Sequence, residues 1–144
     1  MPTVREILDR KGSDVVAMPP TASVLEAARL MNARGIGSVL VMDQGAVVGI
    51  FTERDVLRRV VAERRDPPNT TLGEVMTVSL VTGTATTSIA ECVGTMTRRR
   101  IRHLPILDGD RLLGLVTSGD VLAFQLAEQE STIQHLNSYV YDVR

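Results

Sequence analysis

Two short motifs of the form Thr-x-x-Asp carry the side chains best suited to bind a small molecule. They run from Thr52 to Asp55 and from Thr117 to Asp120, and each follows an apolar, strand-like run. Each motif is expected to place a hydroxyl at the end of a strand and a carboxylate in the first turn of a helix. Such a carboxylate can accept both hydroxyls of a ribose, and the free amides of the helix start favour an anion. The predicted chemistry is binding of a nucleoside that carries phosphate.

The same motif also has a purely structural interpretation. A threonine followed three residues later by an aspartate can simply cap a helix, and for one isolated motif this is the better interpretation. Both interpretations stay open at the level of the motif alone.

The chain repeats itself with a period of 65 residues. Residues 14–57 align with residues 79–122 without a gap,. The identical pairs include Val16 and Val81, Thr21 and Thr86, Ser23 and Ser88, Met31 and Met96, Gly49 and Gly114, Thr52 and Thr117, and Asp55 and Asp120. A weaker match pairs residues 3–8 with residues 71–76 at a shift of 68. The chain is therefore two copies of one unit, followed by a tail.

Each copy is predicted to contain the element order β-α-β-β-α. Ser23 and Ser88 begin capping boxes, each with a glutamate three residues later, and so each starts a helix,. The two helices carry an apolar stripe and end near Gly35 and Arg100,. The Thr-x-x-Asp motifs begin the last helix of each copy. Two hairpins precede them, with strands predicted at residues 39–42 and 47–51, and at 104–107 and 112–116,.

We divide the chain into four parts: a first repeat with an N-terminal lead-in helix (1–64), a linker (65–71), a second repeat (72–125) and a helical tail (126–144). In the tail, Leu126, Ile133, Leu136 and Val140 recur near helical spacing,. The tail is expected to extend the last helix, and its apolar stripe to contact a second subunit in a homodimer. The alternative is that the tail folds back onto its own repeats.

Composition excludes several classes of protein. The 144 residues are 44% hydrophobic and 23% charged, which excludes disorder and collagen,. A formal charge of −1 gives no basic field for nucleic acid or an anionic membrane,. Cys92, His103 and His135 are too few for a closed zinc site, and Cys92 cannot form an internal disulfide,. Without a signal peptide or a run of 18 apolar residues, we expect a cytoplasmic protein with no membrane segment,.

The remaining conspicuous residues have ordinary explanations. The basic run Arg98–His103 is better explained as a solvated helix end or a ligand grip than as a nucleic-acid patch, because no aromatic side chains lie beside it,. Cys92 lies on the apolar stripe of its helix and is expected in the core,. No nucleophile elbow, phosphate-binding lysine loop or zinc-protease motif occurs, so no catalytic residue is predicted,.

Three segments carry a resemblance to a known family: Gly49–Asp55, Gly114–Asp120 and Arg100–Ile106. They resemble the tandem pair of CBS domains, named after cystathionine β-synthase and also called a Bateman module, over roughly residues 1–125. The resemblance implies an α+β fold in which two β-α-β-β-α repeats pack about a pseudo-twofold axis. It also implies two clefts for adenine nucleotides, and pairing of two modules into a disc. Within this family the duplicated Thr-x-x-Asp motif favours ligand binding over capping alone.

By the family's pattern, each cleft takes its ribose aspartate from one copy and much of its phosphate grip from the other. One site then comprises Thr52, Arg54, Asp55, Val81, Arg102 and His103. The other comprises Thr117, Ser118, Asp120, Ser13, Asp14, Gly37 and Ser38. Arg102 can bind phosphate in a bidentate manner, whereas Gly37 and Ser38 supply no charge. Phosphate-bearing ligands are therefore expected to prefer the Asp55 site.

The favoured function is a regulatory protein that senses an adenine nucleotide and acts on an unidentified protein partner by changing its own conformation. AMP is the first choice of ligand, with ADP, ATP, NAD(H) and S-adenosylmethionine as alternatives, and no catalytic cofactor or metal is expected. The alternative function is a dimeric interaction scaffold with empty or structural clefts. An enzyme related to inosine-monophosphate dehydrogenase ranks last, because the catalytic barrel of that family is missing.

Overall fold

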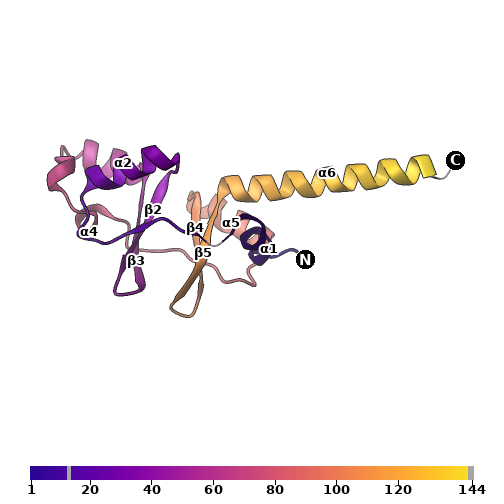
Figure 1. The fold of residues 1–144 in the computed structure, drawn as a ribbon, viewed down its shortest axis with the longest axis horizontal. Helices are drawn as coiled ribbons and strands as arrows, with labels where there is room; N and C mark the ends of the chain where they lie inside the picture. Colours follow the sequence, from indigo (N-terminus) through magenta and orange to yellow (C-terminus); the bar gives the residue numbers. More distant parts are fainter. Residues whose placement is uncertain (13, 143–144) are drawn as a thin grey trace.

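Two small α/β units lie side by side, and a long helix, α6, leaves the second one (Figure 1). The computed structural model describes residues 1–12 and 14–142, so the predicted site residue Ser13 lies outside the described residues. The sheet of the first unit has the order β1-β2-β3, with β1 parallel and β3 antiparallel to β2. The predicted order β-α-β-β-α is confirmed for this unit. Its elements are β1 (Ala17–Met18), α2 (Val24–Arg34), β2 (Ser38–Asp43), β3 (Ala46–Thr52) and α3 (Glu53–Asp55).

The second unit has a two-stranded sheet, β4-β5. The prediction of a further strand before its first helix is therefore wrong. In the first unit the amide of Leu40 donates to the carbonyl of Val16 at 3.0 Å. The equivalent residue of the second unit is Pro105, which has no N–H to donate,. An isolated parallel bridge between Gly83 and Ile106 is what remains. The elements here are α5 (Ile89–Arg99), β4 (His103–Asp108), β5 (Arg111–Thr117) and α6 (Ser118–Asp142).

The helices begin and end where the sequence predicts. The hydroxyls of Ser23 and Ser88 each accept from a backbone N–H at 3.0 Å, so the serine half of each capping box forms,. Both helices end in a left-handed residue, Gly35 with φ 63° and Arg100 with φ 53°,. Between the units the chain forms a π-helical segment (Val56–Val61), a short 3-10 turn (Pro67–Asn69) and α4 (Leu72–Val75).

The lead-in helices are exchanged between the two units. Helix α1 (Val4–Lys11) contributes to the core of the second unit, and α4 contributes to the core of the first. Antiparallel bridges between Thr3 and Ser88 and between Ser23 and Thr71 fix this exchange at equivalent places. The helix that the sequence groups with residues 1–64 therefore packs on the second repeat. The second core contains Val4, Ile7, Ile89, Cys92, Met96, Leu104, Ile106, Val116, Val121 and Phe124.

Two glycines at equivalent positions let the exchanged segments approach the sheets. A Cβ on Gly49 would lie 2.5 Å from the sulfur of Met76, and one on Gly114 would lie 2.7 Å from Cδ2 of Leu8. Leu8 lies in α1, and Met76 directly follows α4. The glycine in each family motif is therefore needed because a lead-in segment packs closely against it.

Helix α6 is one continuous helix of 25 residues, which confirms that the tail extends the last helix. Val121 and Phe124 are buried in the second core, whereas all residues from Gln125 to Asn137 are exposed. Within the described part of the chain, none of the helices has the length and apolar character needed to cross a membrane.

Candidate functional site

Asp55, the first predicted ribose aspartate, is enclosed by protein. Its carboxylate accepts from the backbone N–H of Thr52 at 3.0 Å and from the hydroxyl of Thr77 at 2.9 Å. Arg59, one helical turn later, lies 3.5 Å from the same carboxylate. Asp55 is 4% exposed. A ribose could reach it only after Thr77 or Arg59 moves, so in this structure Asp55 caps a helix and ties two segments together.

Sequence reasoning missed Thr77. This residue follows α4 and forms a two-hydrogen-bond bridge with Ile50 of β3, at 2.9 and 3.0 Å. The pairing brings its hydroxyl over Asp55 from a position 22 residues away in sequence. Arg59 was detectable in principle, because an arginine four residues after an aspartate on a helix is a common ion pair.

Asp120, the second predicted ribose aspartate, lies in a more open place. The backbone N–H of Thr117 donates to its carboxylate at 2.9 Å, which repeats the cap seen at Asp55. Its other partner is Lys11 of the exchanged helix α1, whose Nζ lies 2.6 Å away and also donates to the carbonyl of Leu115 at 2.8 Å. The side chains of Lys11 and Asp120 remain 32% and 23% exposed. A flexible lysine can therefore leave Asp120 far more easily than Thr77 can leave Asp55.

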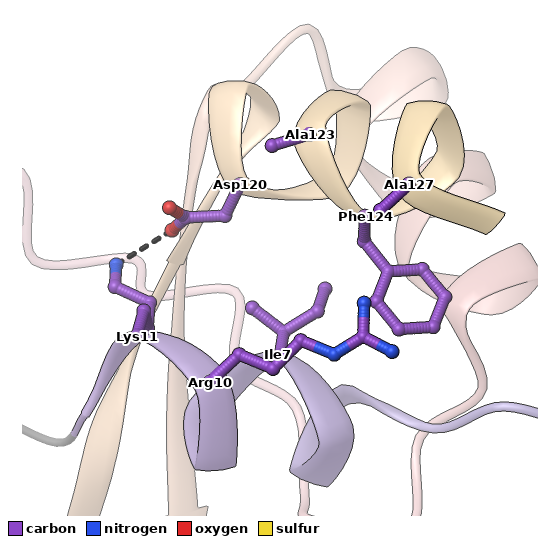
Figure 2. A pocket seen from close by; sticks show the side chains of 7 residues that line it. All are labelled: Ile7, Arg10, Lys11, Asp120, Ala123, Phe124 and Ala127. Atoms are coloured by element: carbon purple, nitrogen blue, oxygen red, sulfur yellow. Dashed lines mark hydrogen bonds and ion pairs between the residues drawn. The ribbon is translucent and has the colours of Figure 1, made fainter. Parts of the chain in front are cut away.

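A pocket of about 220 Å³ opens beside Asp120, between α1 and α6 (Figure 2). In Figure 2 Lys11 points at Asp120 at one end, and Arg10 crosses toward Phe124 at the other. The guanidinium of Arg10 lies 4.6 Å from the centroid of the Phe124 ring and pairs with Glu128 at 3.2 Å,. Lys11 and Arg10 thus bring two positive charges to the pocket beside Asp120. The sequence had assigned only the uncharged Gly37 and Ser38 to the phosphate side of this site. The full lining is Ile7, Arg10, Lys11, Asp120, Ala123, Phe124 and Ala127.

A second pocket, which sequence reasoning did not identify, encloses about 450 Å³ near the end of α2 and the start of α3. The charged residue of its lining is Glu53, and this negative charge does not favour phosphate,. The lining residues are Ala28, Met31, Asn32, Gly35, Ile36, Glu53 and Val56.

The predicted phosphate-binding segments lie beside the motif of their own repeat. The carbonyl of Arg102 accepts from the N–H of Ser118 at 2.9 Å, and His103 is the register partner of Thr117. Gly37 and Ser38 lie in the same way beside Glu53 and Thr52 of the first repeat. Through the backbone, Arg102 and His103 are thus brought next to the Asp120 motif. This arrangement does not support the expected preference of phosphate-bearing ligands for the Asp55 site.

Other predicted site residues are distributed between the two repeats. The guanidinium of Arg54 donates to the carbonyl of Arg100 at 2.9 Å, so Arg54 joins the first repeat to the second. Val81 packs against the core of the second repeat. Asp14 is exposed.

His103 lies where charges from both repeats meet. Burial lowers the pKa of His103 below its ordinary value of 6.5, and the positive charges of Arg102 and Lys11 lower it further,. Glu53 of the first repeat and Asp120 of the second act in the opposite direction. A neutral imidazole between these four charges can donate or accept one hydrogen bond at a ligand without adding charge.

The chain is similar to known proteins over most of its length. A family model described as "CBS domain" matches residues 4–62 and 72–127. The CBS domain-containing protein YhcV of Bacillus subtilis is 33% identical over 125 residues, which covers 87% of this chain and 89% of YhcV. The mitochondrial CBS domain-containing protein CBSX3 of Arabidopsis thaliana is 33% identical over 123 residues, and the match spans 82% of this chain but 60% of CBSX3.

A solved structure gives the same result for the fold. A protein from Burkholderia ambifaria, described as a candidate signal-transduction protein with CBS domains, superposes with a TM-score of 0.85 and 38% identity. The match covers 88% of this chain and 96% of that protein. Because the family matches both repeats and the fold agrees with a relative of this length, the chain belongs to the CBS domain family.

Proposed function

We propose that this chain is a regulatory protein that binds an adenine nucleotide at Asp120, with the ribose on the carboxylate and the phosphate near Lys11. The observation that carries the proposal is the Lys11–Asp120 pair at the rim of the α1–α6 pocket. Asp120 is a motif aspartate that is partly exposed and held by a flexible side chain, whereas Asp55 is closed.

The charges around Asp120 suit a phosphate. Lys11 and Arg10 lie at the end of α1, and Arg102 adjoins Ser118 at the start of α6. Charge-assisted hydrogen bonds from such donors to phosphate are about twice as strong as neutral ones. At about 220 Å³ the pocket is below the ~300–1,000 Å³ of typical ligand sites, so the lysine moves aside when the nucleotide enters,.

The choice of adenine rests on the family. The CBS domain pair of protein MJ0100 was solved in complex with 5′-methylthioadenosine and S-adenosyl-L-methionine, with a TM-score of 0.77 over 88% of this chain. At 24% identity this likeness concerns the fold, so ribose and phosphate binding here is argued from Asp120 and Lys11. AMP remains the first choice, and NAD(H), ATP, ADP and S-adenosylmethionine are the alternatives.

The proposal includes the remaining expectations from the sequence. The chain acts in the cytoplasm as a homodimer, without catalysis, on a protein partner that responds to its shape. The cleft at Thr52, Arg54 and Asp55 is a second ligand site that opens only when Thr77 moves from Asp55.

Calorimetry with AMP tests the proposal, with GTP as the ligand control. Asp120→Ala is expected to weaken AMP binding by at least about 100-fold, because two ribose hydroxyls lose a charged acceptor. Thr132→Ala, on the exposed part of α6, is the control variant and should bind as wild type. Equal binding of AMP by wild type and Asp120→Ala would refute the site.

Lys11→Met separates the two roles given to the lysine. Adenosine, which has no phosphate, is expected to bind this variant about 2- to 5-fold more tightly than it binds wild type, because no ion pair must be broken. AMP is expected to bind about 10-fold or more weakly, because its phosphate loses a cation. A change of the same sign for both ligands would contradict this geometry.

An interaction scaffold is the second candidate, and one observation favours it. Apolar side chains are exposed at equivalent positions of the two repeats, Leu57 with Leu122 and Val61 with Leu126, at 50–63%. Such surfaces are typical of protein contacts. A ligand at about 100 times its Kd should raise the free energy of unfolding by roughly 2.7 kcal/mol. If no adenine compound raises the melting temperature of the wild type, the scaffold becomes the better proposal.

A further inference from the structure

The outer side of α6 carries apolar residues at the spacing of a coiled coil. Leu122, Leu126, Ile133 and Leu136 are exposed by 50–58%. With Gln129 they are separated by steps of 4, 3, 4 and 3 residues, and Val140 continues the sequence pattern by a step of 4. Alternation of 3 and 4 is the period at which one helix packs along another over several turns. We name Leu122, Leu126, Gln129, Ile133 and Leu136 the outer seam.

The outer seam faces away from the chain's own repeats. The opposite side of α6 is occupied, because Val121 and Phe124 are buried in the second core and Glu128 pairs with Arg10 of α1. At about 100° of rotation per residue, the centre of the outer seam lies more than a third of a turn from these contacts. Figure 1 shows α6 running straight past the rest of the molecule. Over the described residues, the tail does not fold back onto the repeats, and the outer seam is exposed.

We infer that the outer seam packs against the outer seam of a second copy of this chain, as a parallel two-stranded coiled coil. This inference rests on the homodimer of the proposed function and specifies where that dimer is held. An identical seam offers the same spacing, so each apolar side chain meets an equivalent one. From Ser118 to Asp142 the sequence has four acidic residues and no lysine or arginine, which disfavours an anionic membrane or nucleic acid as the occupant,.

The residues beside the outer seam fit a parallel pair. The flanking positions hold Ala123, Gln125, Glu130, Thr132 and Asn137, of which Glu130 carries charge. In a parallel pair Glu130 lies opposite Gln125 of the second copy, so no like charges meet, and the two Gln129 amides can bond to each other. An antiparallel pair puts equivalent flanking positions together, and there the two Glu130 side chains can repel each other.

The length of the projecting helix also favours a partner. Fourteen residues of α6 follow Glu128, which makes the ion pair with α1, and all of them up to Asn137 are exposed. An isolated helix of this length is marginal in water. Packing along a second α6 supplies the tertiary contact that stabilises it.

Sedimentation equilibrium of the full chain without nucleotide tests the inference, so failure of nucleotide binding leaves the result unaffected. The variant Ile133→Asp with Leu136→Asp should weaken the dimer by at least about 100-fold, since two apolar layers become charged. The matched control, Ser131→Asp with Gln134→Asp, adds the same charges on the far side of the helix and should leave the dimer intact. A monomeric wild type, or equal dimerisation of both variants, would overturn the inference.

A cysteine at position 129 tests the parallel register. Cys92 is fully buried and its burial raises the pKa of the thiol, so it should not react,. Under mild oxidation Gln129→Cys should form a covalent dimer, and Ser131→Cys, on the far side, should not. A dimer that Gln129→Cys fails to crosslink would refute the parallel register.

Discussion

The two motif aspartates should contribute very differently to stability, although they are equivalent in sequence. Replacing Asp55 by alanine removes the acceptor of the Thr52 amide and of the Thr77 hydroxyl, at a position that is 4% exposed. Replacing Asp120 by alanine removes the acceptor of the Thr117 amide and frees Lys11, at a position that water can reach.

The magnitudes follow from these contacts. Loss of a helix cap costs about 1 kcal/mol, and each buried donor left without an acceptor costs about 1–3 kcal/mol. Asp55→Ala should therefore lower the free energy of unfolding by about 2–4 kcal/mol. For Asp120→Ala water replaces the lost acceptor and the ion pair is worth about 0–1 kcal/mol, so the loss should be about 1 kcal/mol.

Thermal and urea unfolding of both variants, without ligand, measure the difference. At about 3 °C per kcal/mol for a chain of this size, Asp55→Ala should lower the melting temperature by about 6–12 °C and Asp120→Ala by about 3 °C. Equal losses would refute the distinction between a structural and an accessible aspartate. A larger loss for Asp120→Ala would reverse it.

Three further results are expected. Gly49→Ala should destabilise the fold by about 1–3 kcal/mol because its Cβ meets Met76, and adding Met76→Ala should recover part of this in urea unfolding,. Leu72→Ala should cost about 2–5 kcal/mol and speed hydrogen exchange in the first repeat, whose core contains Leu72, rather than in the second,. Because burial lowers the pKa of His103, the unfolded chain binds its proton first, so stability should fall as the pH drops below about 6.5, and less so in His103→Gln,.

Local signals in the sequence predict most of the secondary structure. Ser23 and Ser88 start their helices, and Gly35 and Arg100 end them, because caps depend on residues within one turn,. The missed detail was also local in cause. The first strand of the second repeat would need a backbone N–H at position 105 to pair with, and Pro105 has none,. The residues on either side of Pro105 are nevertheless typical of a strand.

The contacts that determine whether each motif aspartate is accessible join residues far apart in the sequence, and the repeat pattern does not predict them. Residues 3–8 match residues 71–76, and this match identifies two lead-in helices but not which sheet each one covers. Structure shows that they are exchanged, which brings Thr77 over Asp55 and Lys11 over Asp120. The sequence therefore identifies the two aspartates as equivalent motif residues, but it could not predict that one is closed and the other held by a lysine.

Helix α1 joins the proposed ligand site to α6, the helix that carries the proposed dimer contact. Its last two residues hold α6 at successive turns, Lys11 through Asp120 and Arg10 through Phe124 and Glu128. A nucleotide whose ribose binds Asp120 must replace Lys11 there, and its phosphate then competes for both cations. A ligand can shift a protein only through atoms that it contacts differently in two states, and here those atoms fix α6 to the second repeat. Under the proposed function, binding at Asp120 therefore acts directly on the helix whose other face carries the outer seam.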